Sequence, residues 1–176
     1  MVPMKDALAA LDVSSKKLNE KTDSLNKLIE QLEKRLQASQ VGVSVWLDSH
    51  GSQMLDASPE SQHLDPNNEP VGDLVESTGW VLGFAKVAEA GTYEWRIAVH
   101  PVRQIWTPHL VNDWQTSDFR TLSEGEPRPL LKAPRAVRVE AAGLLETLVK
   151  QIAERAASFA EDIEKAEGLV VDDGTI

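Results

Sequence analysis

A repeat of leucines in the first part of the chain constrains the fold more than any other feature of the sequence. Four leucines recur at every seventh position from Leu11 to Leu32, and neither proline nor glycine occurs between Lys5 and Ser39. Leucines spaced by sevens occupy the d positions of a heptad, whose a positions here are apolar at both ends and polar in the middle. The pattern predicts one long helix over residues 5–39 with a narrow, weak apolar seam.

A helix over residues 5–39 is too long for one small core to cover. It would extend roughly 50 Å, because each residue of an α-helix adds about 1.5 Å. Outside the seam its residues are charged with both signs, as is typical of a solvated face. Part of the seam must therefore contact a second helix, either in another subunit as a coiled coil or in the same chain.

The end of the chain supplies a second candidate helix. Pro134 suits the first turn of a helix, and apolar residues then recur at spacings of three and four from Val137 to Ile163. Gly168 is typical of a helix end, so a helix is predicted over residues 134–167, followed by a flexible tail over 169–176. The two long helices favour an antiparallel pair within one chain, and pairing between chains is the alternative.

The middle of the chain predicts an antiparallel sheet of four to five strands over residues 41–122. Apolar and polar residues alternate with the period of two that a strand requires, and Ala90 and Gly91 supply the turn of a hairpin. The candidate strands are 41–47, 79–87, 92–100, 102–106 and 117–122. We therefore expect a single α+β domain over residues 1–176, in which long N-terminal and C-terminal amphipathic helices flank the sheet.

Residues 49–77 show no clear helix or strand pattern. Glycine, proline and asparagine interrupt a mostly polar stretch. Because long structureless loops are uncommon inside compact domains, the stretch is either a mobile loop, a lid over a site, or the surroundings of a short helix near residues 71–75. We predict a long loop over 49–77.

Composition excludes several classes of function. The 176 residues include no cysteine, which excludes a disulfide framework, a thiolate zinc site and a cysteine nucleophile. A net charge of −10 disfavours binding to nucleic acid or to anionic lipid surfaces. No signal peptide is recognisable, and no apolar run approaches the roughly 20 residues that span a bilayer. We expect a cytoplasmic protein that binds neither nucleic acid nor membrane.

The sequence offers no motif of an enzyme or of a metal site. The chain lacks a glycine-rich phosphate loop, and its histidines do not have the spacing of metal ligands. We therefore predict no catalytic residue, no metal and no cofactor. Should a pocket form between the sheet and the loop 49–77, the polar side chains available to it are His50, Arg96, His100 and His109.

A basic segment in this acidic chain is the more informative cluster. It comprises Arg128, Lys132, Arg135 and Arg138. Arg135 and Arg138 fall in the first turn of the predicted second helix, where cations oppose the helix dipole. They would bind an anion or an acidic partner, or else pair with acids of the same chain such as Glu94, Glu124 or Glu126.

Tryptophans suggest a second contact surface. Five tryptophans lie in the middle region, and Trp106 and Trp114 belong to a stretch rich in turn residues. Tryptophan and arginine are enriched at binding hot spots. We therefore predict a partner or anion contact formed by Trp106, Trp114 and the basic segment.

These patterns favour a non-enzymatic protein for protein–protein interaction or regulation. It would self-associate through its long helices, as a homodimer, and contact a protein partner. The alternative is a small-ligand-binding protein or an enzyme with a pocket between the sheet and the loop 49–77. A cavity that holds at least two of the four polar side chains would favour this alternative.

Overall fold

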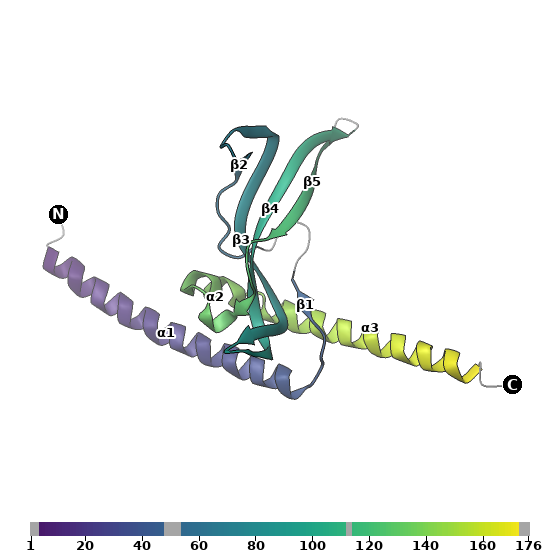
Figure 1. Ribbon diagram of the computed structural model, residues 1–176. Coiled ribbons are helices and arrows are strands. Elements are labelled where there is room, and N and C mark those ends of the chain that lie inside the picture. The colour runs from purple at the N-terminus through teal and green to yellow at the C-terminus, as the bar shows by residue number, and fades with distance from the viewer. Residues whose placement is uncertain (1–3, 48–53, 112–113, 173–176) are drawn as a thin grey trace.

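The computed structural model describes the backbone of residues 4–47, 54–111 and 114–172 and, within these ranges, all side chains except those of 108–119 and 168–172. Figure 1 shows mixed α+β architecture, with helices at both ends of the chain and an antiparallel sheet between them. The elements are α1 (Met4–Ala38), β1 (Val45–Trp46), β2 (Ser61–Leu64), β3 (Pro70–Glu89), β4 (Thr92–Val111), β5 (Trp114–Ser123), β6 (Arg128–Pro129), the 3-10 turn η1 (Leu130–Lys132), α2 (Arg135–Ala142) and α3 (Leu145–Asp172).

The first helix agrees with the sequence pattern. Helix α1 is continuous over 35 residues, and its bounds differ by one residue from those predicted at each end. The buried residues are confined to its second half, where Ile29 and Leu36 belong to the core. The heptad therefore predicts the helix correctly, although only part of the seam packs within the chain.

The second predicted helix is two helices. Helix α2 ends where the N–H groups of Gly143 and Leu144 donate to carbonyls three residues earlier, at 3.1 and 2.9 Å, and α3 then starts at Leu145. Sequence spacing misses this break because the tight turn keeps the apolar residues on the core side. The predicted end at Gly168 is also wrong, since α3 continues to Asp172. Glycine permits a helix end without requiring one.

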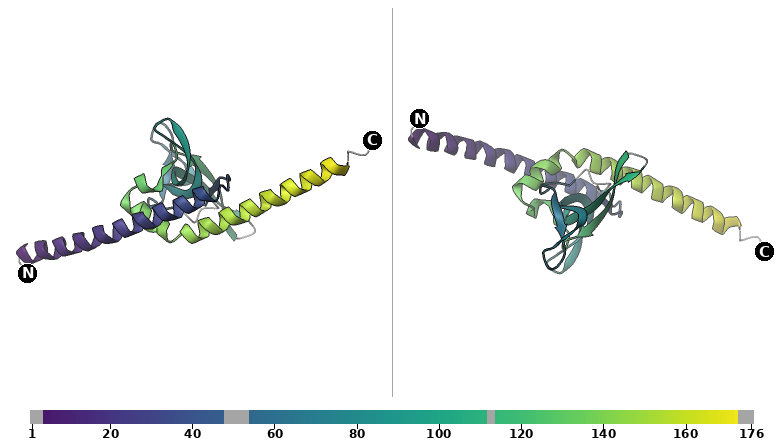
Figure 2. Two further views of the ribbon diagram at one scale, coloured as in Figure 1. Left: turned by 90° about the horizontal axis from the view of Figure 1, so that it is seen from below. Right: turned by 90° about the horizontal axis from the view of Figure 1, so that it is seen from above.

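The two long helices do not form the predicted antiparallel pair. Helices α1 and α3 run in the same general direction and are offset along it, so that each extends beyond the sheet at the opposite end of the molecule (Figures 1 and 2). Residues 28–35 of α1 and residues 145–150 of α3 line a common groove. Each helix therefore has one half against the core and one half outside it.

Within the described residues the sheet has six antiparallel strands, one more than the upper limit of the prediction. The strand order is β1-β3-β4-β5, with β2 paired to β3 and β6 paired to β4. The predicted hairpin is confirmed: Glu89 pairs with Thr92, and Ala90 and Gly91 have φ of 50° and 85°. Positive φ at both central residues is the geometry that matches the twist of a two-residue hairpin.

Three predicted strands merge into two long ones. Strands β3 and β4 have 20 residues each, and β4 continues through Pro101. Pro101 lies opposite Trp80, whose own N–H and C=O bond to Leu55 and not to β4. The nitrogen of Pro101 therefore occupies a position that makes no hydrogen bond to β3, which is why this proline does not end the strand.

The predicted loop 49–77 contains a hairpin, and this prediction was wrong for most of its length. Strand β2 pairs with the first part of β3, and the loop signals Pro66, Asn67 and Asn68 lie in the turn between them. The Asp65 carboxylate accepts the N–H groups of Asn67 and Glu69 at 2.8 and 2.9 Å, and these bonds, that from Glu69 foremost, lower the pKa of Asp65. The alternative of a short helix at 71–75 is replaced by strand β3.

The predicted first strand, 41–47, reduces to the two residues of β1. Val45 pairs with Phe84, and Trp46 pairs with Gly83. The indole of Trp46 lies so close to Gly83 that a β-carbon there would approach the indole Cε3 atom to 2.2 Å. Gly83 is thus required by the close approach of the tryptophan, and this contact positions the segment that follows α1.

The core lies between the lower part of the sheet and the helices. Leu82, Phe84, Ile97 and Val99 of the sheet are buried against helical residues. The helical residues of this core are Ile29, Leu36, Val137, Ala141, Leu145, Leu148 and Ile152. Beyond this core, β2, β5 and the adjoining parts of β3 and β4 extend away from the helices as a sheet arm (Figure 1).

Helix α1 also covers the edge of β4 that β5 leaves unpaired. Strand β5 pairs with β4 only from Val102 onward, and β6 pairs with Ala98 and Val99, so the earlier backbone of β4 needs other partners on this edge. Gln37 donates its side-chain Nε2 to the carbonyl of Trp95 at 2.7 Å, and Glu33 accepts the N–H of Ile97 at 2.9 Å. The second half of α1 is therefore fixed to the sheet by hydrogen bonds as well as by apolar packing.

Candidate interaction surfaces

The first half of α1 presents apolar residues outside the core. Every residue from Met4 to Lys21 is exposed, and Thr22 is the first buried one. Leu8, Leu11 and Leu18, which continue the heptad seam, are 54%, 59% and 49% exposed. We call residues 4–21 the free half of α1 and residues 22–38 its anchored half.

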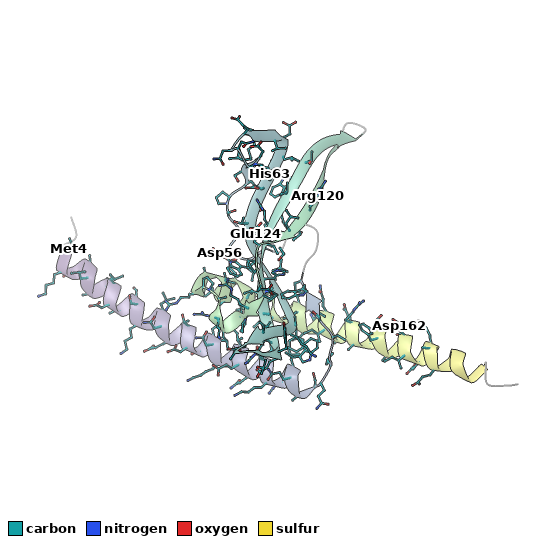
Figure 3. All side chains as sticks on the ribbon, in the orientation of Figure 1. Met4, Asp56, His63, Arg120, Glu124 and Asp162 are labelled. Carbon is teal, nitrogen blue, oxygen red and sulfur yellow. The ribbon has the colours of Figure 1, made fainter. Side chains whose placement is uncertain are left out.

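The second half of α3 mirrors this arrangement at the opposite end of the molecule. Its residues 157–167 are exposed, including Phe159 at 44% and Ile163 at 58%. These two side chains continue the stripe that buries Leu148 and Ile152 within the core, because they follow at helical spacings of three and four. We call residues 153–167 the free half of α3. Figure 3 shows Met4 and Asp162 on the two free halves, which extend at opposite ends of the molecule.

The two free halves differ in net charge, which is +1 for residues 4–21 and −3 for residues 153–167. The end of the free half of α1 contains Lys16, Lys17 and Lys21 with one acid, Glu20. In contrast, the free half of α3 contains four acids near its end, Glu161, Asp162, Glu164 and Glu167, with one nearby base, Lys165. Opposite charge on two elongated surfaces favours their association and disfavours association of the acidic surface with itself.

A groove separates the two helices where they lie together. Its volume is about 490 Å³, and Leu28, Leu32 and Val149 are among its lining residues. Arg35, Glu146 and Lys150 border the same groove. Leu28 is 54% exposed, so the groove adds apolar surface to the helical layer.

The basic segment is engaged within the chain. The guanidinium of Arg128 lies 4.7 Å from the centre of the Trp80 ring, and Lys132 forms an ion pair with Glu89 at 2.5 Å. The hydrogen bond from Lys132 is the main cause that lowers the pKa of Glu89. Arg135 donates to the side-chain oxygen of Asn19 at 3.0 Å.

Arg138 is held by backbone carbonyls of its own chain. Its guanidinium donates to the carbonyls of Leu131, at 3.3 Å, and of Ala133. These carbonyls precede α2, so Arg138 stabilises the turn that leads into the helix although a cation there opposes the helix dipole. The sequence prediction considered only acids and anions as partners and therefore did not consider backbone carbonyls.

Arg96 belongs to an acidic cluster that joins three elements. It contacts Glu33 of α1 at 3.0 Å, Glu89 of β3 at 3.1 Å and Glu94 of β4 at 2.7 Å. The hydrogen bond with Glu33 is the main cause that raises the pKa of Arg96. Since the Glu33 side chain is only 6% exposed, this cluster fixes α1 to the hairpin.

His100 closes the turn that follows β5. Its Nε2 lies 2.8 Å from the Ser123 hydroxyl and 2.9 Å from the carbonyl of Gly125. A carbonyl only accepts hydrogen bonds, so the geometry places the proton on Nε2. A nitrogen that already carries a proton cannot take one from Ser123, and the arrangement is suited to holding a turn.

Of the four side chains of the predicted alternative pocket, the structure describes only Arg96 and His100. His50 and the side chain of His109 lie outside the described residues. Three surface grooves are lined by described residues, and neither Arg96 nor His100 lines any of these three. The prediction that the four side chains share a pocket is not decided by this placement.

The sheet arm carries a polar network that sequence reasoning missed. Glu76 lies 2.7 Å from Nδ1 of His63 and 3.7 Å from Arg103, which pairs with Glu124 at 2.7 Å. The strand register brings these residues to one face, and the sequence gives no signal for it without the β2–β3 pairing. Figure 3 shows His63 in the arm and Glu124 at its base.

The predicted aromatic contacts also fall on the sheet arm. Trp106 is half-buried and lies opposite Val75 of β3 and Phe119 of β5. Trp114 is the first residue of β5, and its side chain lies outside the described ones. Trp106 and the basic segment therefore occupy different parts of the molecule, the arm and the base of the sheet.

Among the described residues, no cluster of three or more histidine or acidic side chains has the geometry to hold a metal ion. Within the same part of the chain, no helix has the length and apolar character needed to cross a membrane. Comparisons with family models, with curated proteins and with solved structures find no match to this chain.

Proposed function

We propose that this protein is a non-enzymatic interaction or regulatory protein that self-associates through its long helices. The observation that carries the proposal is the division of α1, whose seam is buried or partly buried from Thr22 onward and exposed before it. Leu8, Leu11 and Leu18 are each about half exposed. Apolar residues at heptad spacing on a projecting helix are the usual surface of a helical oligomer.

The way helices are stabilised adds support. In proteins most of the stability of a helix comes from packing of its apolar face, and little comes from intrinsic propensity. The free half of α1 has such a face, and all of its residues are exposed although Asn19 accepts a hydrogen bond from Arg135. Association would supply the missing packing.

The sheet arm is the surface we assign to a different protein partner. It stands away from the helices (Figure 1), so a partner bound to it would not compete with self-association. Its half-buried Trp106 and its polar network of His63, Glu76 and Arg103 combine apolar area with polar groups, as binding surfaces do. The runner-up function, a small-ligand-binding protein or an enzyme, lacks a comparable supporting observation.

Sedimentation velocity over a range of protein concentrations tests the self-association. The wild-type protein should show a mass that rises with concentration toward a dimer. Replacing Leu11 and Leu18 together by lysine should shift the protein to monomer while its melting temperature at low concentration stays that of the wild type. A wild-type mass that stays monomeric at every concentration would refute the proposal.

The matched control is Val13→Lys. Val13 lies on the same free half and is 71% exposed, and its heptad position is f, on the side away from the seam. The substitution therefore introduces the same charge into the same helix without touching the seam. It should leave the association unchanged, and equal loss of association in both variants would indicate a general charge effect.

A further inference from the structure

We infer that the partner of each free half is the other free half in a second copy of the chain: the free half of α1 packs antiparallel on the free half of α3 of its partner, and the reverse. This inference rests on the proposed self-association and specifies its contact. The pairing uses residues 4–21 of one copy and residues 153–167 of the other. A closed dimer then contains two identical helix pairs.

The placement of the free halves at opposite ends is the first argument. Helices α1 and α3 run in the same general direction and extend beyond the sheet at opposite ends (Figures 1 and 2). A two-fold rotation about an axis perpendicular to this direction exchanges the two ends and reverses the helices. It brings each α1 to the end where the other copy's α3 extends, and two-fold symmetry is the commonest in soluble oligomers.

Matching apolar stripes are the second argument. The free half of α1 offers Leu8, Leu11 and Leu18, which are about half exposed. Correspondingly, the free half of α3 offers Phe159 and Ile163, at 44% and 58%. On both helices these residues continue the apolar stripe that packs in the core of their own chain. Each free half therefore extends this stripe beyond the part of the helix that the core covers.

Charge decides between this pairing and the two self-pairings. The acids of α3, Glu161, Asp162, Glu164 and Glu167, would face each other if α3 paired with its own copy, which is unfavourable. Pairing α1 with α1 would leave these acids and the apolar pair Phe159 and Ile163 unused. Only the cross-pairing brings Lys16, Lys17 and Lys21 toward the acidic helix.

A mixing experiment with two variants tests the inference. One variant carries Leu11→Lys and Leu18→Lys, and the other carries Phe159→Asp and Ile163→Asp. In a cross-paired dimer of one variant, both helix pairs contain an altered helix and are destabilised. Each variant alone should therefore sediment as a monomer. A 1:1 mixture should recover a dimer, because one of its two helix pairs combines an unaltered α1 with an unaltered α3.

The outcomes separate this inference from the proposed function. If α1 pairs with α1, the α3 variant stays dimeric and mixing does not recruit the α1 variant, so the inference fails while self-association stands. The same reasoning applied to α3 self-pairing predicts the mirror-image result. If the wild-type protein forms a series of oligomers larger than a dimer, the closed dimer is contradicted. If it stays monomeric at all concentrations, both the cross-pairing and the proposed self-association are refuted.

Two single variants control for charge and folding. Val13→Lys on α1 and Ala157→Asp on α3 place the same charges at exposed positions away from the two apolar stripes. Both should dimerise as the wild type does. At low concentration all variants should keep the melting midpoint of the wild type, measured by circular dichroism. Every substituted residue is exposed in the single chain, and the apolar residues of the two stripes are about half exposed.

Discussion

The two halves of helix α1 have the same kind of sequence and opposite surroundings. In the anchored half, Ile29 is fully buried and Glu33 is 5% exposed, whereas every residue of the free half is exposed. Both halves carry leucine at the d positions of one heptad. The repeat therefore specifies which side of the helix is apolar, and the extent of the sheet determines where that side becomes core.

This difference has consequences for stability and for binding. A substitution in the anchored half removes contacts within one chain, so its effect should be independent of protein concentration. In the proposed dimer, substitution of the exposed leucines of the free half mainly removes contacts with another molecule, so its effect should appear as a change in association. The predictions below test this separation.

The largest effect is expected for Ile29→Ala in the anchored half. Ile29 is 0% exposed, and removal of a large buried side chain leaves a cavity that costs about 2 to 5 kcal/mol. Urea denaturation followed by circular dichroism should show this loss at every protein concentration. The control is Leu11→Ala, at 59% exposure, which should change the unfolding free energy of the monomer by less than about 0.5 kcal/mol. Equal losses for the two would mean that the halves do not differ.

A smaller loss is expected for Glu33→Ala. Glu33 accepts the N–H of Ile97 and pairs with Arg96, so its removal leaves a buried donor and a partly buried cation without this partner. The expected cost is about 1 to 3 kcal/mol, below that of a fully buried pair because Arg96 is 26% exposed and keeps two other acids. Thermal unfolding measures it. Glu30→Ala, at an exposed position of the same half, is the control and should be nearly neutral.

Sequence patterns predict elements better than they predict their ends. The absence of proline and glycine and the leucine spacing are enough to place α1 within one residue at each end. The same reasoning misses the break after Ala142, because a tight turn at Gly143 and Leu144 preserves the apolar spacing. It also misses β2, since Pro66, Asn67 and Asn68 signal a turn without showing that strands lie on both sides of it.

The surfaces were harder to predict than the elements, for a physical reason. The basic segment is visible in the sequence, but Arg138 is held by backbone carbonyls, which any residue could supply. His63 and Glu76 meet only through the β2–β3 register. The exposure of Leu8, Leu11 and Leu18 depends on where the sheet ends relative to α1, which no local pattern encodes.

Hydrogen exchange should show the boundary between the halves directly. At low protein concentration, amides of the free half should exchange through local opening at little free-energy cost, and amides around Ile29 should require nearly global unfolding. If the free half pairs with a second copy, a tenfold rise in concentration above the dissociation constant should raise its protection by about 0.7 kcal/mol, because the monomer fraction of a dimer falls with the square root of concentration. Mass spectrometry of peptides on the two sides of Thr22 measures this. Uniform protection along α1 at low concentration would contradict the division.

The smallest effect concerns two serines that differ in the half they occupy. Ser15 lies in the free half and Ser24 in the anchored half, and both are exposed. Alanine is a better helix former than serine by roughly 0.5 kcal/mol, and Ser24 also donates its hydroxyl to the carbonyl of Glu20 at 2.9 Å, which competes with regular helix bonding. Ser24→Ala should therefore raise the unfolding free energy by about 0.5 kcal/mol, because the anchored half unfolds together with the core. Ser15→Ala should increase the helical circular dichroism signal of the native monomer and leave its unfolding midpoint unchanged, since the free half can lose its structure without disrupting the core. If Ser15→Ala shifts the midpoint as much as Ser24→Ala does, the free half unfolds cooperatively with the rest of the chain, and the two halves of α1 form a single unit in solution.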